Sequence, residues 1–164
     1  MSELSIFSYL PAEDPDVLDQ LQERIELIRH KLKFVELVPA VACIKSLSPL
    51  KMAGGLVPEL IRLAGGRAVE TEDLAAADPS YIIVALADCP LNKAMSQIDT
   101  LMNLPGWESL DAVKNGRIYF ADGVDHFNDS PQGIVATVEM VAEILNPKQF
   151  AFGYENEGWI KFSI

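Results

Sequence analysis

The stretch from Val41 to Gly66 constrains the fold of this chain more than any other part of its sequence. An apolar run, Val38 to Ile44, leads into it and predicts a buried strand. A helix is expected to begin near Val57-Pro58 and to end at Gly65-Gly66, because proline lacks an amide that the first turn does not use and glycine adopts a positive φ at low cost. Strand, loop and helix in this order form half of a βαβ unit.

The rest of the chain repeats this alternation of strands and helices. Further helices are predicted over residues 15–33, 74–77, 90–102 and 134–145, and further strands over 67–70, 81–86 and 117–121. This order predicts a three-layer α/β/α sandwich with a mainly parallel sheet of about four strands. A long amphipathic helix precedes it, with an apolar stripe at i+3/i+4 spacing. The stripe comprises Leu18, Leu21, Ile25, Ile28 and Leu32.

We divide the chain into two parts on this basis. Residues 1–36 form an N-terminal arm and the long helix, and residues 37–164 form a single Rossmann-like lobe with an aromatic C-terminal tail. The tail from Lys148 onward is too rich in aromatic residues for a disordered segment, so we expect it to pack back on the domain or on a partner.

The composition limits the classes of partner. The 164 residues carry a net charge of −11, which argues against nucleic acid and anionic membrane surfaces, because both require lysine and arginine to offset phosphate charge. No run approaches the ~18 apolar residues of a membrane span, so we expect no direct membrane insertion. The first 16 residues lack the features of a secretory signal. The chain as it stands is therefore expected to be cytoplasmic, and periplasmic if it is an excised segment of a longer secreted protein.

No established catalytic motif is present. The glycine pairs do not match the spacing of a dinucleotide-binding loop. Two hypotheses place chemistry on loops at the carboxyl edge of the sheet. Cys89 with His126 and Asp125 would make a nucleophilic site, and the same three residues with Asp88 would supply metal donors. Lone Cys and His residues are more often structural, and Cys43 is expected to be a small buried hydrophobe.

Several motifs occur in an order typical of one family. They are Asp78-Pro79-Ser80-Tyr81-Ile82-Ile83-Val84, Leu104-Pro105-Gly106-Trp107, Val113-Lys114-Asn115-Gly116-Arg117-Ile118-Tyr119 and Glu143-Ile144-Leu145-Asn146-Pro147. From about Asp16 to its end the chain resembles the C-terminal lobe of the cobalamin- and iron-siderophore-type substrate-binding proteins of ABC transporters (class III periplasmic binding proteins). The resemblance implies a non-enzymatic protein that binds ligand between two lobes and delivers it to a membrane permease. The helix over residues 15–33 resembles the end of the interlobe helix, and the N-terminal lobe has no counterpart here.

The positions that face the ligand in this family differ in the present chain. Where corrinoid-binding relatives carry E-W-L-D-P, this chain has Lys45-Ser46-Leu47-Ser48-Pro49, and where they carry G-H-W-V-P-E it has Gly54-Gly55-Leu56-Val57-Pro58-Glu59. Both tryptophans are replaced, which removes flat apolar contact area for a large ring. The third loop, often rich in arginine in relatives, has none over residues 128–133. The scaffold is retained and the ligand contacts of the family are largely replaced.

The resemblance and these departures together predict a non-catalytic binding module that self-associates as a homodimer. The ligand-binding candidates lie on the three edge loops and are Ser46, Leu47, Leu56, Asp88, Cys89, His126 and Phe127. No cofactor is required, and the ligand class would be a corrinoid, haem or a ferric siderophore. An ABC permease would be a partner if the chain is part of a full-length protein. The alternatives are a structural homodimer without ligand and a small enzyme that uses Cys89 and His126.

Overall fold

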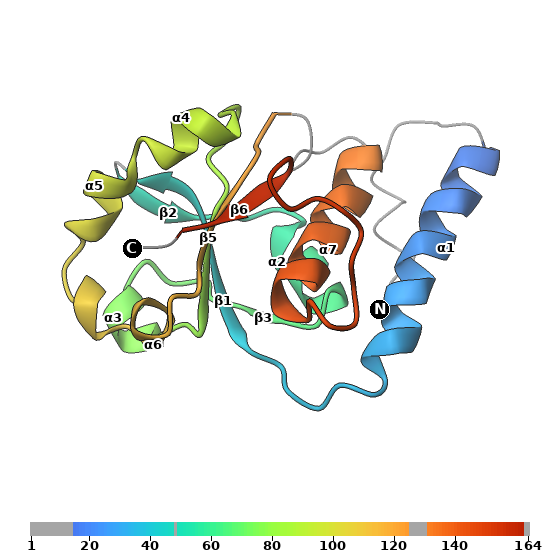
Figure 1. The fold of residues 1–164 in the computed structure, drawn as a ribbon, viewed down its shortest axis with the longest axis horizontal. Helices are drawn as coiled ribbons and strands as arrows, with labels where there is room; N and C mark the ends of the chain where they lie inside the picture. Colours follow the sequence, from blue (N-terminus) through green and yellow to red (C-terminus); the bar gives the residue numbers. More distant parts are fainter. Residues whose placement is uncertain (1–14, 48, 125–130, 163–164) are drawn as a thin grey trace.

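The computed structural model describes residues 15–47, 49–124 and 131–162 (Figure 1). The helices are α1 (Pro15–Leu32), α2 (Val57–Leu63), α3 (Leu74–Ala77), α4 (Leu91–Met95), α5 (Ile98–Met102), the 3-10 turn η2 (Trp107–Ser109), α6 (Asp111–Lys114) and α7 (Pro131–Leu145). The strands are β1 (Ala40–Leu47), β2 (Leu50–Met52), β3 (Arg67–Ala68), β4 (Tyr81–Val84), β5 (Ile118–Ala121) and β6 (Trp159–Lys161). Among the described helices, none is long and apolar enough to cross a membrane.

The strands form one sheet in the order β2-β1-β4-β5-β6, and β3 pairs with the amino-terminal end of β1. Strands β3, β1, β4 and β5 run parallel, whereas β2 and β6 are antiparallel to their neighbours. Val41 lies beside Tyr81, and Ile82 lies beside Ile118. The predicted mainly parallel sheet is confirmed, with two antiparallel strands added to it.

Helices cover both faces of the sheet, which confirms the three-layer sandwich. Helices α1, α2 and α7 lie on one face, and α3 to α6 lie on the other (Figure 1). Alternate residues of each strand divide between two cores. Val41, Cys43 and Ile83 face α2 and α7, whereas Ala42 and Ile82 face the short helices on the other side. A strand that is buried on both faces reads as a continuous apolar run, which is how β1 and β4 were predicted.

Helix α1 packs against α7 through its predicted stripe. Leu21, Ile25 and Ile28 are buried there. Each such side chain stabilises the fold by about 1.5–3 kcal/mol relative to an exposed position. The observed end at Leu32 agrees with the predicted end near Lys33.

Two segments differ from their predicted structure. The loop predicted over residues 45–56 is partly a hairpin, because β1 continues to Leu47 and turns back into β2, so that Leu47 and Met52 are buried. The helix predicted over residues 90–102 is divided into α4 and α5. The hydroxyl of Ser96 donates to the carbonyl of Lys93 at 2.6 Å, and such local hydrogen bonds compete with helix continuation.

The aromatic tail packs back on the domain, as predicted. Strand β6 joins the sheet beside β5, with Trp159 opposite Ala121. Phe150 and Trp159 are buried in the core that faces α7. The ring of Trp159 meets that of Tyr119 edge to face at 5.6 Å. The tail is therefore part of the sheet and of the core.

Candidate functional site

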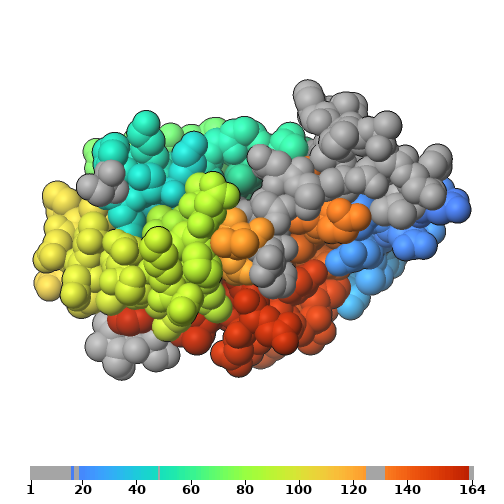
Figure 2. Space-filling model, turned by 90° about the horizontal axis from the view of Figure 1, so that it is seen from above, coloured from blue at the N-terminus to red at the C-terminus, as the bar shows by residue number. Residues whose placement is uncertain are grey.

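A hollow of about 420 Å³ lies at the carboxyl edge of the parallel strands. It is formed by Lys45 of β1 and by three further segments, namely the connection from β2 to α2, the loop after β4 and the loop after β5. Figure 2 looks onto this edge, where these segments (cyan, green and orange) come together. The lining residues are Lys45, Ala53, Gly54, Gly55, Leu56, Val57, Ala85, Ala87, Asp88 and Gly123. Open α/β sheets bind their ligands at this edge.

The loops after β4 and β5 are held together at Gly123. Its amide donates to the carbonyl of Cys89 at 3.0 Å. A Cβ at this position would lie 2.1 Å from the carbonyl oxygen of Leu86, a contact that no side chain tolerates. Only glycine therefore allows the two loops to approach this closely.

The connection from β2 to α2 presents backbone rather than bulky side chains to the hollow. The amide of Ala53 donates to the carbonyl of Cys43 at 2.8 Å, which ties the start of the connection to β1. Gly55 has a φ of +61°, and the amide of Val57 donates to the carbonyl of Gly54 at 3.1 Å as α2 begins. Leu56 adds a half-buried apolar side chain. This wall can contact a ligand closely.

Two charges of opposite sign flank the hollow. Lys45 and Asp88 are both exposed, and they belong to different segments. Asp88 has a φ of +54°, a backbone conformation that aspartate tolerates better than most residues. The hollow can therefore offer an ammonium, a carboxylate and an apolar surface to one ligand. Within the residues that the structure describes, no group of three or more His, Cys, Asp or Glu side chains could hold a metal ion.

The structure brings together two of the predicted ligand-binding residues, Leu56 and Asp88. Leu47 is buried in the core that faces α3 to α6, and it does not line the hollow. The hydroxyl of Ser46 donates to the carbonyl of Pro49 at 2.8 Å, within the turn between β1 and β2. His126 and Phe127 lie outside the described residues.

Both cysteines are buried. Cys89 belongs to the core that faces α3 to α6, and its Sγ lies 3.6 Å from the carbonyl oxygen of Pro90. Cys89 does not line the hollow, although Asp88 beside it does. Burial raises the pKa of the Cys43 thiol to about 12, so this thiol stays protonated at neutral pH. His126 and Asp125, the other members of the predicted nucleophilic site, lie outside the described residues.

Two functional features of the hollow were absent from the predicted set. Lys45 occupies the place of the glutamate in the family motif, and this difference was the available signal for it. Gly123 follows Asp122 directly after β5, and a glycine in such a loop indicates a close approach of backbones. Neither signal shows by itself which segment lies opposite.

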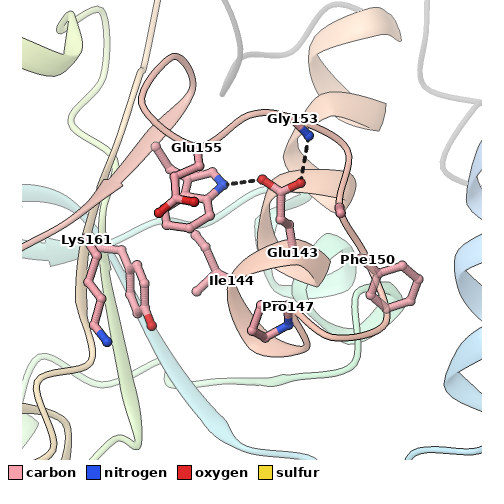
Figure 3. Close-up of a pocket in the computed structure, with 10 residues that line it drawn as sticks. Glu143, Ile144, Pro147, Phe150, Gly153, Glu155 and Lys161 are labelled. Carbon is pink, nitrogen blue, oxygen red and sulfur yellow. Dashed lines mark hydrogen bonds between the residues drawn. The ribbon is translucent and has the colours of Figure 1, made fainter.

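A second hollow, of about 340 Å³, lies between the end of α7 and the tail (Figure 3). The buried carboxylate of Glu143 is central to this region. It accepts hydrogen bonds from the amides of Gly153 at 3.0 Å and Tyr154 at 3.2 Å, from the indole nitrogen of Trp159 at 2.8 Å, and from the amide of Phe152. With this many donors, the hydrogen-bonding capacity of the buried carboxylate is satisfied. Glu143 therefore holds the tail in place.

Comparisons with known proteins give matches among solved structures. Neither protein-family models nor curated protein sequences match the chain. An ABC transporter substrate-binding protein from Listeria monocytogenes superposes with a TM-score of 0.65 at 20% identity, over 79% of this chain and 55% of that protein. A periplasmic heme-binding protein from Pseudomonas aeruginosa gives 0.63 at 18% identity, over 91% of this chain and 56% of that protein. An ABC-type Fe3+-hydroxamate transport system from Saccharomonospora viridis superposes with a TM-score of 0.58 at 18% identity, over 79% of this chain and 48% of that protein.

These likenesses confirm the predicted resemblance at the level of the fold. The chain spans about half the length of each of these three proteins. It has the fold of one lobe of an ABC transporter substrate-binding protein.

Proposed function

We propose that this chain is a non-catalytic binding module that holds a small-molecule ligand in the carboxyl-edge hollow. The observation that carries the proposal is the convergence of three loops on one hollow, in which Lys45, Leu56 and Asp88 offer two charges and an apolar contact. The structural neighbours, whose names describe substrate-binding and heme-binding proteins, support a binding role. An ABC permease is the corresponding partner if the chain belongs to a longer transport protein.

The ligand class is a corrinoid, haem or a ferric siderophore, bound weakly. The two segments that carry tryptophan in corrinoid-binding relatives have none here, over residues 45–49 and 54–59. Each lost aromatic contact removes about 1 kcal/mol, or roughly a fivefold loss of affinity. The remaining contacts come from the backbone of Gly54 and Gly55 and from the side chains of Lys45, Leu56 and Asp88.

Isothermal titration of the full chain with haem, cyanocobalamin and ferrichrome tests this proposal. Lys45→Ala and Asp88→Ala are expected to weaken binding of the active ligand at least about fivefold. Lys51→Ala is the matched control, because Lys51 is exposed on β2 and does not line the hollow. Absence of binding for all three compounds up to about 0.5 mM would overturn the proposal. Equal loss of affinity in the Lys51 control would also contradict it.

Self-association is a second proposed property, and a specific surface favours it. Leu27 and Phe34 are 49% and 77% exposed, and with His30 they recur at i, i+3 and i+7 along α1 and the turn that follows it. The rings of His30 and Phe34 meet edge to face at 6.2 Å. An apolar stripe of this spacing on a helix is typical of helix–helix contact, and a second copy of the chain would cover it.

Sedimentation equilibrium tests this second proposal. The unmodified chain is expected to be a dimer, and the double variant Leu27→Ser/Phe34→Ser is expected to be a monomer. Met102→Ser is the control, because Met102 is also exposed but lies on α5, on the opposite side of the sheet. A strict monomer at about 200 µM for the unmodified chain would count against the dimer.

A further inference from the structure

A third hollow, of about 420 Å³, lies at the opposite edge of the sheet, where β1 begins at the bottom of Figure 1. It is formed by the segment before β1, the starts of β3 and β4, the turn before β5 and the end of α7. The lining residues are Leu37, Val38, Pro39, Ala40, Arg67, Ala77, Asp78, Ser80, Tyr81, Arg117, Leu145 and Asn146. This edge is remote from the one at which the proposed ligand of the module binds.

Two arginines line this hollow, and neither has an acidic partner among the described residues. Arg67 is the first residue of β3, and Arg117 directly precedes β5. Neither guanidinium forms an ion pair or donates a hydrogen bond within the part of the chain that the structure describes. Arg117 instead lies over the ring of Tyr81, 5.2 Å from its centroid. The lining carries these two arginines and one aspartate, Asp78, so the hollow keeps a net positive charge in a chain whose net charge is −11.

Further unused hydrogen-bond donors line the same hollow. The hydroxyls of Ser80 and Tyr81 have no hydrogen-bond partner among the described residues. Asn146 also lines it, and its Nδ2 is the one buried side-chain nitrogen or oxygen that lacks a partner in the described chain. This nitrogen has almost no exposed surface, so Asn146 is not counted among the groups that would contact a ligand in the hollow.

The acidic residue of the hollow is already engaged. The Oδ1 of Asp78 accepts a hydrogen bond from the amide of Asp111 at 2.8 Å, at the start of α6. The arginines also do not serve to cap the helices that end at this edge, because neither donates to the terminal carbonyls of α2 or α7. Within the described part of the chain, neither guanidinium group therefore takes part in an ion pair or a hydrogen bond, and Arg117 contacts the ring of Tyr81.

We infer that this edge is a second binding site, for a small organic anion. Arginine presents its donors as a planar fork that matches the oxygens of a carboxylate or a phosphate. Leu37 and Val38, which are 82% and 59% exposed, provide an apolar rim for the uncharged part of the same ligand. The volume lies within the range of sites that hold small molecules. Arg67 and Arg117 would bind the anionic group, and Ser80 and Tyr81 would add hydrogen bonds.

Titration of the isotope-labelled full chain, followed by amide chemical shifts, tests this inference with three probes. Comparison of phenyl phosphate with benzoate distinguishes a phosphate group from a carboxylate. Comparison of phenyl phosphate with inorganic phosphate measures the contribution of the apolar ring. We expect saturable shifts at the amides of residues 37, 38, 40, 80, 81 and 117 with phenyl phosphate or benzoate. We expect binding at least about tenfold weaker with inorganic phosphate, which cannot contact Leu37. Shifts that do not saturate, or that lie elsewhere on the chain, would overturn the inference.

Arginine variants complete the test. Arg67→Met/Arg117→Met is expected to weaken binding at least about tenfold, whereas Arg62→Met, at an arginine of α2 paired with Glu59, leaves it unchanged. Arg67→Lys/Arg117→Lys retains the charges and keeps the test valid if the methionine variant does not fold. The double lysine variant is expected to weaken binding about threefold or more, because lysine lacks the planar fork of hydrogen-bond donors that arginine has. Unchanged affinity in both double variants would contradict the inference, whatever the outcome of the haem, cyanocobalamin and ferrichrome titrations.

Discussion

Arg24 of α1 and Glu139 of α7 form an ion pair between residues 115 positions apart in the sequence. The Nε of Arg24 donates to Oε2 of Glu139 at 3.1 Å, and Nη2 donates to Oε1. The hydroxyl of Tyr154, in the tail, donates to the same Oε1 at 2.7 Å. The hydrogen bond to Glu139 raises the pKa of Arg24, and burial raises the pKa of Tyr154. One buried carboxylate thus joins the first helix, the last helix and the tail.

Removal of Arg24 is expected to destabilise the fold. In Arg24→Met the buried carboxylate of Glu139 keeps, among the described residues, the hydroxyl of Tyr154 as its one side-chain partner. We therefore expect a loss of about 1–2 kcal/mol, which is less than for a fully buried pair because Arg24 is partly exposed. Urea unfolding followed by circular dichroism measures this. Arg29→Met, which removes an exposed pair with Glu26, should cost less than about 0.5 kcal/mol. Equal losses in the two variants would contradict the proposed importance of the Arg24–Glu139 pair.

The carboxylate of Glu143 is expected to anchor the tail. Glu143→Gln replaces one acceptor oxygen by an NH2 group that faces donors, so at least one of its four contacts is lost. We expect a loss of about 2–3 kcal/mol and a red shift of tryptophan emission as Trp159 becomes exposed. Glu155→Gln, at an exposed position at the rim of the same hollow, is the control and should leave both quantities unchanged.

Glycine at position 123 is expected to be required at the carboxyl edge, in contrast to glycine at 54. Gly123→Ala would bring a Cβ to 2.1 Å from the carbonyl of Leu86, so the loops after β4 and β5 must separate, at a cost of about 2 kcal/mol or more. A Cβ at Gly54 would meet no atom within 4 Å, so Gly54→Ala should change stability by less than about 1 kcal/mol. Thermal unfolding of both variants decides this, and an equal effect at the two positions would refute the argument.

Alkaline pH is expected to destabilise the chain through its buried acids. Burial raises the pKa of Tyr119 from 10.0 to about 12 and that of Cys43 from 9.0 to about 12. In the unfolded chain these groups ionise at their ordinary values, so between those values and about pH 12 the folded state binds more protons. Their stabilisation is complete below about pH 9 and is lost as the pH rises toward 12.

The variant Tyr119→Phe isolates one of these groups. Its ring keeps the contacts with Tyr81 and Trp159 but cannot ionise. The free energy of unfolding, measured in urea at about pH 8, 9.5 and 11, should therefore fall less steeply above about pH 10 in this variant than in the unmodified chain. Identical pH profiles would show that Tyr119 does not contribute.

The main elements of the fold could be predicted from local patterns. Each of these patterns lies within a few neighbouring residues and predicts the element that contains it. Examples are the apolar stripe of α1, the proline and glycine at the ends of α2, and the apolar run of β4. The strand β2 and the division between α4 and α5 were missed. A three-residue strand has too few positions for a pattern, and its formation depends on pairing with β1.

The site could be predicted only as an edge of the sheet. Leu56 and Asp88 line the carboxyl-edge hollow, whereas Leu47 and Cys89 point into a core. Alternation along a strand assigns residues to one face or the other, but it does not identify which side chain at a strand end turns outward. Lys45 and Gly123 were missed because their roles depend on the loop opposite them.

The sequence by itself determined the order of helices and strands, the three-layer sandwich and the edge at which loops gather. Those features follow from periodicity and from turn residues, which act over a few neighbouring positions. Only the tertiary structure decided that Glu139 pairs with Arg24, that Gly123 lies against Leu86, and that Arg67 and Arg117 line one hollow. These relationships depend on strand order and on the packing of α1 and α7, which bring together residues that are far apart along the chain.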